Sequence, residues 1–139
     1  MTDFELRDHT ADVAVAATGG SLGVVFGAVA DGMAAAMCDD IPDSGGQRFD
    51  LDVTAGGRES LLFDYLDGLI YERDVRGVLP VDNSATVGRT DEGGWQVAAS
   101  ARGVALDTIE ARDLKAVTYS EMDLSETDNG WRAYVVFDV

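Results

Sequence analysis

The chain has 139 residues, 46% of them hydrophobic, which suits one folded domain over residues 1–139 and argues against disorder. No apolar run reaches the ~20 residues of a membrane-spanning helix. The N-terminus also lacks the basic-then-apolar pattern of a signal peptide, so we expect a cytoplasmic protein that does not bind membranes. The net charge of −16, with 26 acidic and 10 basic residues, disfavours direct nucleic-acid binding by this chain alone.

The same charge has an environmental explanation. Aspartate far outnumbers glutamate, and Lys115 is the only lysine beside nine arginines. Halophilic proteins use a high net charge to stay soluble, and concentrated salt screens the self-repulsion that it causes. The composition therefore predicts a salt-rich, halophilic cytoplasm.

In chain order, the hydrophobic pattern first predicts two short strands, at residues 4–6 and 12–18. Ser21 is a suitable N-cap, and apolar residues at helical spacing follow it, so we expect a helix that ends at Asp39. Three glycines within this segment weaken the prediction, because glycine disfavours helix. Residues 49–53 alternate between apolar and polar, which indicates a strand with one buried face.

A second helix, after Gly56-Gly57, is the clearest prediction in the chain. Its apolar positions recur at the spacing of one helix face, with charged residues mostly outside them. These apolar positions are Leu61, Leu62, Tyr65, Leu66, Leu69 and Ile70.

The second half is rich in strands. Residues 85–89 and 95–101 flank a turn that contains two glycines, and we expect them to form a hairpin. A strand beginning near residue 114 and a last strand at 131–139 flank the hairpin signal Asn129-Gly130. Two helices packed on a mainly antiparallel β-sheet make an α+β domain.

Common catalytic motifs are missing: there is no P-loop, nucleophile elbow or zinc motif. His9 is the only histidine, which excludes a histidine-rich metal site. We interpret it as a structural hydrogen-bonding residue or as one that orients nearby aspartates. Cys38 is the only cysteine, so no intrachain disulfide forms, and a buried, inert thiol is expected.

The acidic groups are better candidates for a site. Asp12, Asp138 and the terminal carboxylate of Val139 could offer oxygen ligands to a divalent cation if the first and last long strands are neighbours. Sequence spacing does not show that they meet. In a chain with 19 aspartates, a chance pair of this kind is common.

Five segments, in order along the chain, resemble the archease family. The opening Asp8-His9-Thr10-Ala11-Asp12-Val13 is similar to the first motif of that family. A first helix ending in Met37-Cys38-Asp39 and a second helix at residues 59–66 follow. Residues 114–120, LKAVTYS, resemble the family strand VKAVTYH, and residues 131–139 resemble its terminal strand, which ends in Asp and one aliphatic residue.

The resemblance implies an archease-like α+β domain that acts as a protein cofactor of the tRNA-splicing RNA ligase and is not itself an enzyme. Such a cofactor promotes ligase guanylylation and multiple turnover, and can broaden the nucleotides that the ligase accepts. The resemblance also implies a divalent metal ion, calcium in the family, with magnesium or manganese as alternatives. Asp12, Asp138 and Val139 match the residues that hold it.

Asp39 and Lys115 match an acidic position and a lysine of the family, and together with His9 they are further candidate functional residues. The alternatives are a solvated aspartate at a helix end and a surface charge at a strand end. Ser120 stands where the family strand commonly has histidine, so the role of that histidine does not transfer. Two other functions remain open: a chaperone-like binding module with an incidental ion, and a metal-dependent phosphoesterase.

Overall fold

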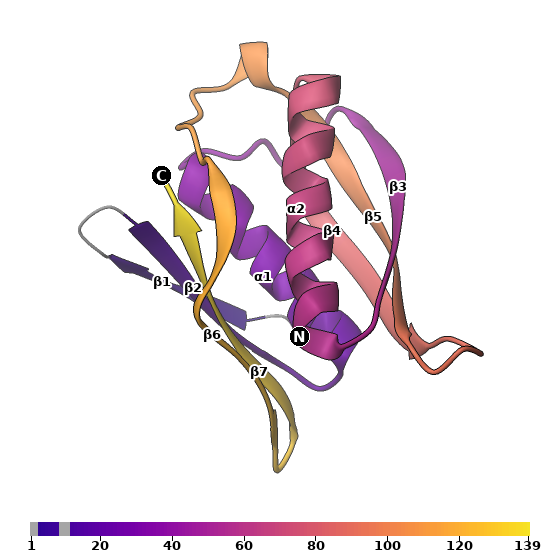
Figure 1. Cartoon of the computed structure of the whole chain (residues 1–139). Coiled ribbons are helices and arrows are strands. Elements are labelled where there is room, and N and C mark those ends of the chain that lie inside the picture. Colours follow the sequence, from indigo (N-terminus) through magenta and orange to yellow (C-terminus); the bar gives the residue numbers. More distant parts are fainter. Residues whose placement is uncertain (1–2, 9–11) are drawn as a thin grey trace.

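The computed structural model describes residues 3–8 and 12–139, in which strands and helices follow the predicted order (Figure 1). The strands are β1 (Asp3–Asp8), β2 (Asp12–Gly19), β3 (Gln47–Ala55), β4 (Val78–Arg89), β5 (Trp95–Ala105), β6 (Ala116–Thr127) and β7 (Gly130–Asp138). The helices are α1 (Leu22–Met37) and α2 (Arg58–Arg76). His9, a candidate from the sequence, lies outside the described residues. Within the described ranges, neither helix is long and apolar enough to cross a bilayer.

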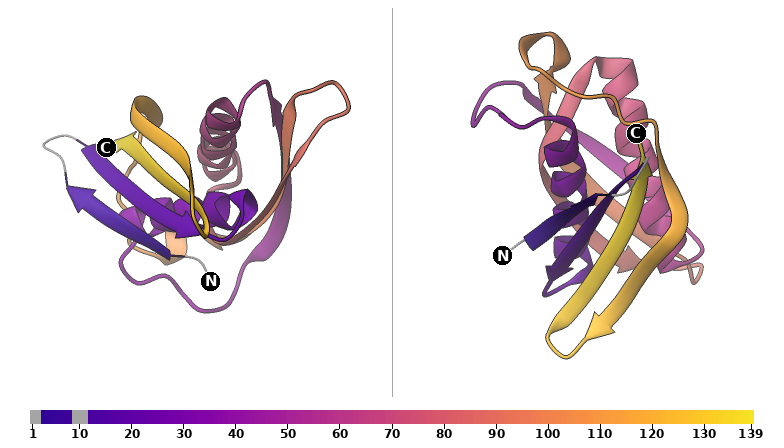
Figure 2. Two further views of the ribbon diagram at one scale, coloured as in Figure 1. Left: turned by 90° about the horizontal axis from the view of Figure 1, so that it is seen from below. Right: turned by 90° about the vertical axis from the view of Figure 1, so that its left-hand side faces the viewer.

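The strands form two antiparallel sheets. One has the order β1-β2-β7-β6 and the other the order β3-β5-β4. Both helices lie between the sheets, as Figure 2 shows from below, and each contacts strands of both. The expected α+β class is therefore confirmed, with the antiparallel strands divided between two sheets that enclose the helices.

Helix α1 begins as predicted, because the Ser21 hydroxyl accepts a hydrogen bond from the Val24 amide at 3.2 Å. Its glycines, which weakened the prediction, allow the helix to pack closely against β4. A Cβ atom at Gly23 would lie 2.4 Å from the Ala85 carbonyl oxygen, and one at Gly27 would lie 3.1 Å from the Asn83 carbonyl oxygen. Tertiary packing thus offsets the low helix propensity of glycine.

One turn further along the same face of α1, the contact with β4 becomes polar. Oδ1 of Asp31 accepts hydrogen bonds from the backbone amide and from the side-chain Nδ2 of Asn83, both at 2.9 Å. Asn83 lies in a bulge of β4, where the pairing with β5 shifts after Val81. This bulge turns the Asn83 amide towards the helix.

Helix α2 buries the predicted stripe, in which Leu61, Leu62, Tyr65 and Leu66 are fully enclosed. The helix is capped at its C-terminus by Gly77, which has a left-handed backbone conformation (φ 66°). The Gly77 backbone N–H donates a hydrogen bond to the Arg73 carbonyl oxygen. Near this end, Arg73 Nη1 donates to the Leu114 carbonyl oxygen at 2.9 Å and contacts Met37 Sδ at 3.2 Å. Arg73 therefore joins α2, the end of α1 and the segment before β6.

Candidate functional site

The two aspartates singled out from the sequence are directly opposite each other. Strands β2 and β7 pair antiparallel, from Gly19 opposite Trp131 at one end to Asp12 opposite Asp138 at the other. The two aspartates are therefore the last paired residues at their end of the strands. The register is fixed by buried side chains, among them Val15, Val135 and Phe137, because a one-residue slip would turn them out of the core. The structure thus meets the condition that the sequence left open, because the first and last long strands are neighbours.

The position of this pair favours a cation. Opposite residues of an antiparallel pair have Cβ atoms about 4.5–5.5 Å apart, and like charges there are destabilising. Asp138 is exposed and Asp12 is half-buried, so both carboxylates pair at a solvent-accessible end of the sheet. Carboxylate oxygens are the ligands that calcium and magnesium prefer, and the donor chemistry fits either ion.

The carboxylate pair is not a complete ligand set. Among the residues that the structure describes, no group of three His, Cys, Asp or Glu side chains is placed to hold a metal ion. Val139, the third residue that the family resemblance assigns to the ion, follows Asp138 directly and is 47% exposed. An ion held here would therefore keep several water ligands.

Lys115 lies beside the same pair. Its backbone amide donates to the Asp138 carbonyl oxygen at 2.8 Å, and its neighbour Ala116 is the β6 partner of Asp138. The residue is exposed, and no described carboxylate lies within 4 Å of its ammonium group. The structure thus brings the only lysine of the chain to the candidate site.

Asp39 is bound by an arginine that the sequence did not single out. Arg112 donates Nη2 to Oδ1 of Asp39 at 2.9 Å and Nη1 to Oδ2 at 3.2 Å. The same guanidinium donates to the Ala36 carbonyl oxygen at 2.9 and 3.1 Å, so it also caps the end of α1. The hydrogen bonds and charge of Arg112 lower the pKa of Asp39. Asp39 is therefore solvated and paired, and it does not join the Asp12–Asp138 pair.

A short segment nevertheless places Asp39 at the same end of the molecule as that pair. The Arg112 amide donates to the Met37 carbonyl oxygen at 2.6 Å, and three residues later the Lys115 amide donates to Asp138. Three residues span at most about 11 Å. Residues 112–115 thus connect the end of α1 to the end of β7.

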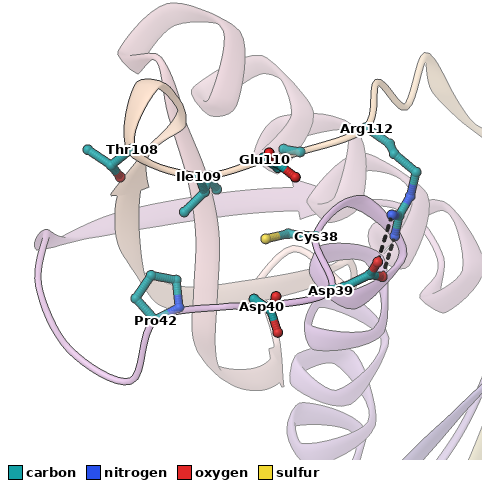
Figure 3. Close-up of a pocket in the computed structure, with 9 residues that line it drawn as sticks. Cys38, Asp39, Asp40, Pro42, Thr108, Ile109, Glu110 and Arg112 are labelled. Atoms are coloured by element: carbon teal, nitrogen blue, oxygen red, sulfur yellow. Dashed lines mark hydrogen bonds and ion pairs between the residues drawn. The ribbon is translucent and has the colours of Figure 1, made fainter.

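Beside Asp39 the chain forms a cleft with a volume of about 680 Å³ (Figure 3). We call it the helix-end cleft. One wall is the segment after α1 and the other is the loop before β6. Its lining residues are Cys38, Asp39, Asp40, Pro42, Thr108, Ile109, Glu110, Ala111 and Arg112. Cys38 is buried, as predicted, and its sulfur points into the cleft in Figure 3.

Comparisons with known proteins identify relatives along nearly the whole chain. The Archease protein family matches residues 4–139. The chain is 32% identical to the protein archease of Methanosarcina barkeri, over 98% of this chain and 95% of that one. It is 30% identical to the protein archease of Thermococcus gammatolerans over the full length of both chains.

Two solved structures have the same fold. The solution structure of a protein from Methanobacterium thermoautotrophicum superposes with a TM-score of 0.81 and 29% identity, over 98% of both chains. The crystal structure of an archease from Thermotoga maritima, described as a possible chaperone, has a TM-score of 0.65 at 20% identity, over 96% and 94% of the two chains. The family match along nearly the whole sequence, together with these relatives, shows that the chain belongs to the archease family.

Proposed function

We propose that this protein is an activator of the tRNA-splicing RNA ligase, which it assists in guanylylation and multiple turnover without catalysing ligation itself. The observation that carries the proposal is the cross-strand pairing of Asp12 with Asp138. Membership of the archease family supports this process, and the pair offers carboxylate oxygens that suit a divalent ion.

The proposed ion is calcium, with magnesium or manganese as alternatives, and the ligands are Asp12, Asp138 and an oxygen of Val139. When bound, a divalent ion supplies positive charge that can neutralise phosphate oxygens of a nucleotide. The protein itself positions the two carboxylates on adjacent strands and presents Lys115 next to them. It shifts the ligase towards its reactive state only in so far as it binds that state more tightly.

The first experiment measures guanylylation of the ligase from the same organism at limiting concentration, in high salt, with and without this protein. We expect a higher rate or turnover with the wild-type protein. The variants Asp12→Asn and Asp138→Asn should lose the stimulation while keeping the fold, because both residues lie at a solvent-accessible strand end.

A matched control is the double variant Asp50→Asn/Asp52→Asn, which removes two exposed carboxylates from β3 in the other sheet. It should stimulate the ligase as the wild type does. A direct readout is calcium or manganese binding by calorimetry, which the Asp12 and Asp138 variants should weaken and the control should not. Normal stimulation by both site variants would refute the role of the pair.

A further inference from the structure

We propose that the outer side of helix α2 is a docking surface for a basic segment of a partner protein. Three of the five large hydrophobic side chains that are exposed in the described structure lie on or beside this helix. Tyr71 and Val75 are each 63% exposed, and Tyr119 of β6 is 54% exposed. We call the surface formed by Asp64, Asp67, Tyr71, Val75 and Tyr119 the α2 face.

The helix contributes a row of residues to this face. Phe63, Asp67, Tyr71 and Val75 follow one another at intervals of four, which places them on neighbouring turns along one side of the helix. Figure 1 shows α2 in front of β4 and β5, with β6 on one side of it and β3 on the other. The exposure of Tyr71 and Val75 means that the described chain leaves this side of the helix open to a partner.

Folding alone does not account for Tyr71 and Val75. Neither side chain is part of the core, and both residue types have a lower helix propensity than the alanine, lysine or glutamate that suit an exposed helix position. Exposed apolar patches that are bordered by polar residues are typical of protein interaction sites. The row therefore has the composition of an interface.

Tyr119 extends the face from the neighbouring strand and is held in place. Its ring stacks on Phe63, with the ring centroids 4.1 Å apart and an interplanar angle of 7°. Strand β6 is bulged here, because its pairing with β7 shifts between Thr118 and Asp123, and bulges re-aim side chains. An exposed tyrosine that is already ordered loses little conformational entropy on binding, which suits it to anchor a partner.

The charges of the face favour a basic partner. Asp64 and Asp67 are exposed, and no described cation lies within 4 Å of either carboxylate. Burial, and to a smaller extent the Asp64 charge, raises the pKa of Tyr119, so this carboxylate acts on the aromatic part of the face. Arginine and lysine can pair with such carboxylates while their stems pack on tyrosine rings.

The same charges disfavour the other occupants of an open helix side. Two copies of the chain joined through this face would bring Asp64 and Asp67 towards their own counterparts, and each copy has a net charge of −16. Nucleic acids and anionic lipid surfaces are negative and would be repelled. A protein segment with basic and apolar side chains complements both properties of the face. Naming the RNA ligase as its source rests on the function proposed above.

The first test measures affinity for the ligase of the same organism by calorimetry in high salt. The double variant Tyr71→Ala/Val75→Ala should bind about tenfold more weakly or worse, because salt does not screen apolar contacts. Alanine has a higher helix propensity than either residue, so the substitutions should not weaken α2 itself. Thermal unfolding of the variant verifies that the fold is kept.

A second pair of variants separates the position of the charge from its amount. Asp64→Asn/Asp67→Asn should weaken ligase binding about three- to tenfold at the lowest salt concentration that keeps both proteins folded, as for two exposed ion pairs. Asp50→Asn/Asp52→Asn removes the same charge from exposed positions of β3 and should not weaken it. Equal affinity of these two double variants, together with normal binding by the Tyr71/Val75 variant, would overturn the ligase as the partner.

A third arm does not depend on the ligase. The probe is a synthetic amphipathic helical peptide of leucine and arginine, added to isotope-labelled protein, and its control is the same peptide with glutamine in place of arginine. We expect saturable backbone amide shifts at residues 63–75 and 117–121 with the arginine peptide only. Shifts elsewhere, or equal shifts with both peptides, would overturn the α2 face as a surface for basic segments.

Sedimentation of the protein alone tests the competing occupant. Self-association of the wild type that Tyr71→Ala abolishes would make a second copy the occupant and would overturn the proposal. A wild type that does not stimulate the ligase would refute the proposed function, whereas the peptide titration decides the α2 face independently.

Discussion

Asp31 is the most unusual carboxylate of the described residues, because it lies half-buried between α1 and β4. Loss of solvent raises its pKa, while the two hydrogen bonds from Asn83 act in the opposite direction. Burial, and to a smaller extent the Asp31 charge, raises the pKa of Tyr65, whose hydroxyl has no hydrogen-bond partner within the described chain. This interior is therefore better suited to a neutral acceptor than to a carboxylate.

A substitution at Asp31 tests this interpretation. Because the pKa of Asp31 is higher in the folded than in the unfolded protein, the native state binds a proton at this residue more tightly. The free energy of unfolding therefore falls as the pH rises from the unfolded-state pKa of about 4 through the folded-state pKa. Asp31→Asn keeps an oxygen acceptor and should be more stable than the wild type at neutral pH, with the difference vanishing in acid. Urea unfolding over a pH series measures it.

The control at this position is Asp31→Ala, which leaves the buried Asn83 amide without its acceptor. It should lose about 1–3 kcal/mol of unfolding free energy in acid, where Asp31 of the wild type is neutral, and less at neutral pH, because the variant also lacks the desolvated charge. If Asn and Ala variants were equally unstable at neutral pH, desolvation of the charge would not be the dominant effect.

Asp39 predicts a pH dependence of the opposite sign. Arg112 lowers its folded-state pKa, so the ionised pair stabilises the protein above the unfolded pKa of about 4, and this contribution is lost as pH falls through the folded value. Asp39→Asn should be less stable than the wild type near neutral pH and equal to it in strong acid. Thermal unfolding across the acid range measures the difference, with the neighbouring Asp40→Asn as control. A constant difference at every pH would refute the ion pair.

At the scale of elements, the glycines of α1 show why local propensity alone was a poor guide. Gly23 brings the helix so close to β4 that a Cβ atom would lie 2.4 Å from a backbone oxygen, which cannot move aside easily. Gly68, inside α2, meets only the side chain of Leu51 at 3.3 Å. A side chain at position 23 would therefore clash with backbone, whereas a side chain at position 68 would contact only a side chain that can move.

Alanine substitution distinguishes the two cases. In an exposed helix, Gly→Ala stabilises by about 1 kcal/mol. We expect Gly23→Ala instead to destabilise the protein by about 2 kcal/mol or more, through overpacking against the Ala85 carbonyl. Gly68→Ala should stay within about 1 kcal/mol of the wild type. Chemical denaturation gives both values, and a stabilised Gly23→Ala would show that α1 can shift away from β4.

The elements were predictable where one face is apolar and the ends carry local signals. Ser21 capped α1 as expected, the stripe from Leu61 to Ile70 formed α2, and Asn129-Gly130 formed the last hairpin. The sequence did not predict that residues 78–84 belong to strand β4. Pro80 and the bulge at Asp82-Asn83 interrupt the alternation of apolar and polar residues there. Separation into two sheets is a long-range property that no local window contains.

The candidate site was predictable only in part, for the same reason. Asp12 and Asp138 could be named from the sequence, but their pairing depends on the register of β2 against β7. The role of Arg112 could not be predicted from the sequence, because an arginine in a polar loop is usually a solvated surface residue. Its role appears only where the loop meets the end of α1.

At the scale of the whole molecule, the net charge of −16 should make stability depend on salt. The Debye length falls from about 10 Å at 0.1 M to about 3 Å at 1 M, so repulsion between surface carboxylates weakens steeply. We expect the urea midpoint of unfolding to rise with potassium chloride concentration over this range. A midpoint that does not change with salt would refute the interpretation of the composition as an adaptation to a salt-rich cytoplasm.

The tryptophan–arginine contacts should respond differently from the surface carboxylates. The Arg58 guanidinium lies 5.0 Å from the Trp131 ring and 5.8 Å from the Trp95 ring, and so joins the first turn of α2 to a strand of each sheet. Contacts of this kind combine attraction to the ring with apolar burial. They give the molecule a link between its two sheets that concentrated salt weakens less than exposed ion pairs.

The pairing of Asp12 with Asp138 has a consequence for biosynthesis. The two partners lie 126 residues apart in the chain, so Asp12 is synthesised well before Asp138, and contacts of such high sequence separation form late in folding. A nascent chain that has not yet added β7 holds half of the carboxylate pair and cannot present it. Anything that binds between these aspartates would thus select finished, folded molecules, and would stabilise them by mass action.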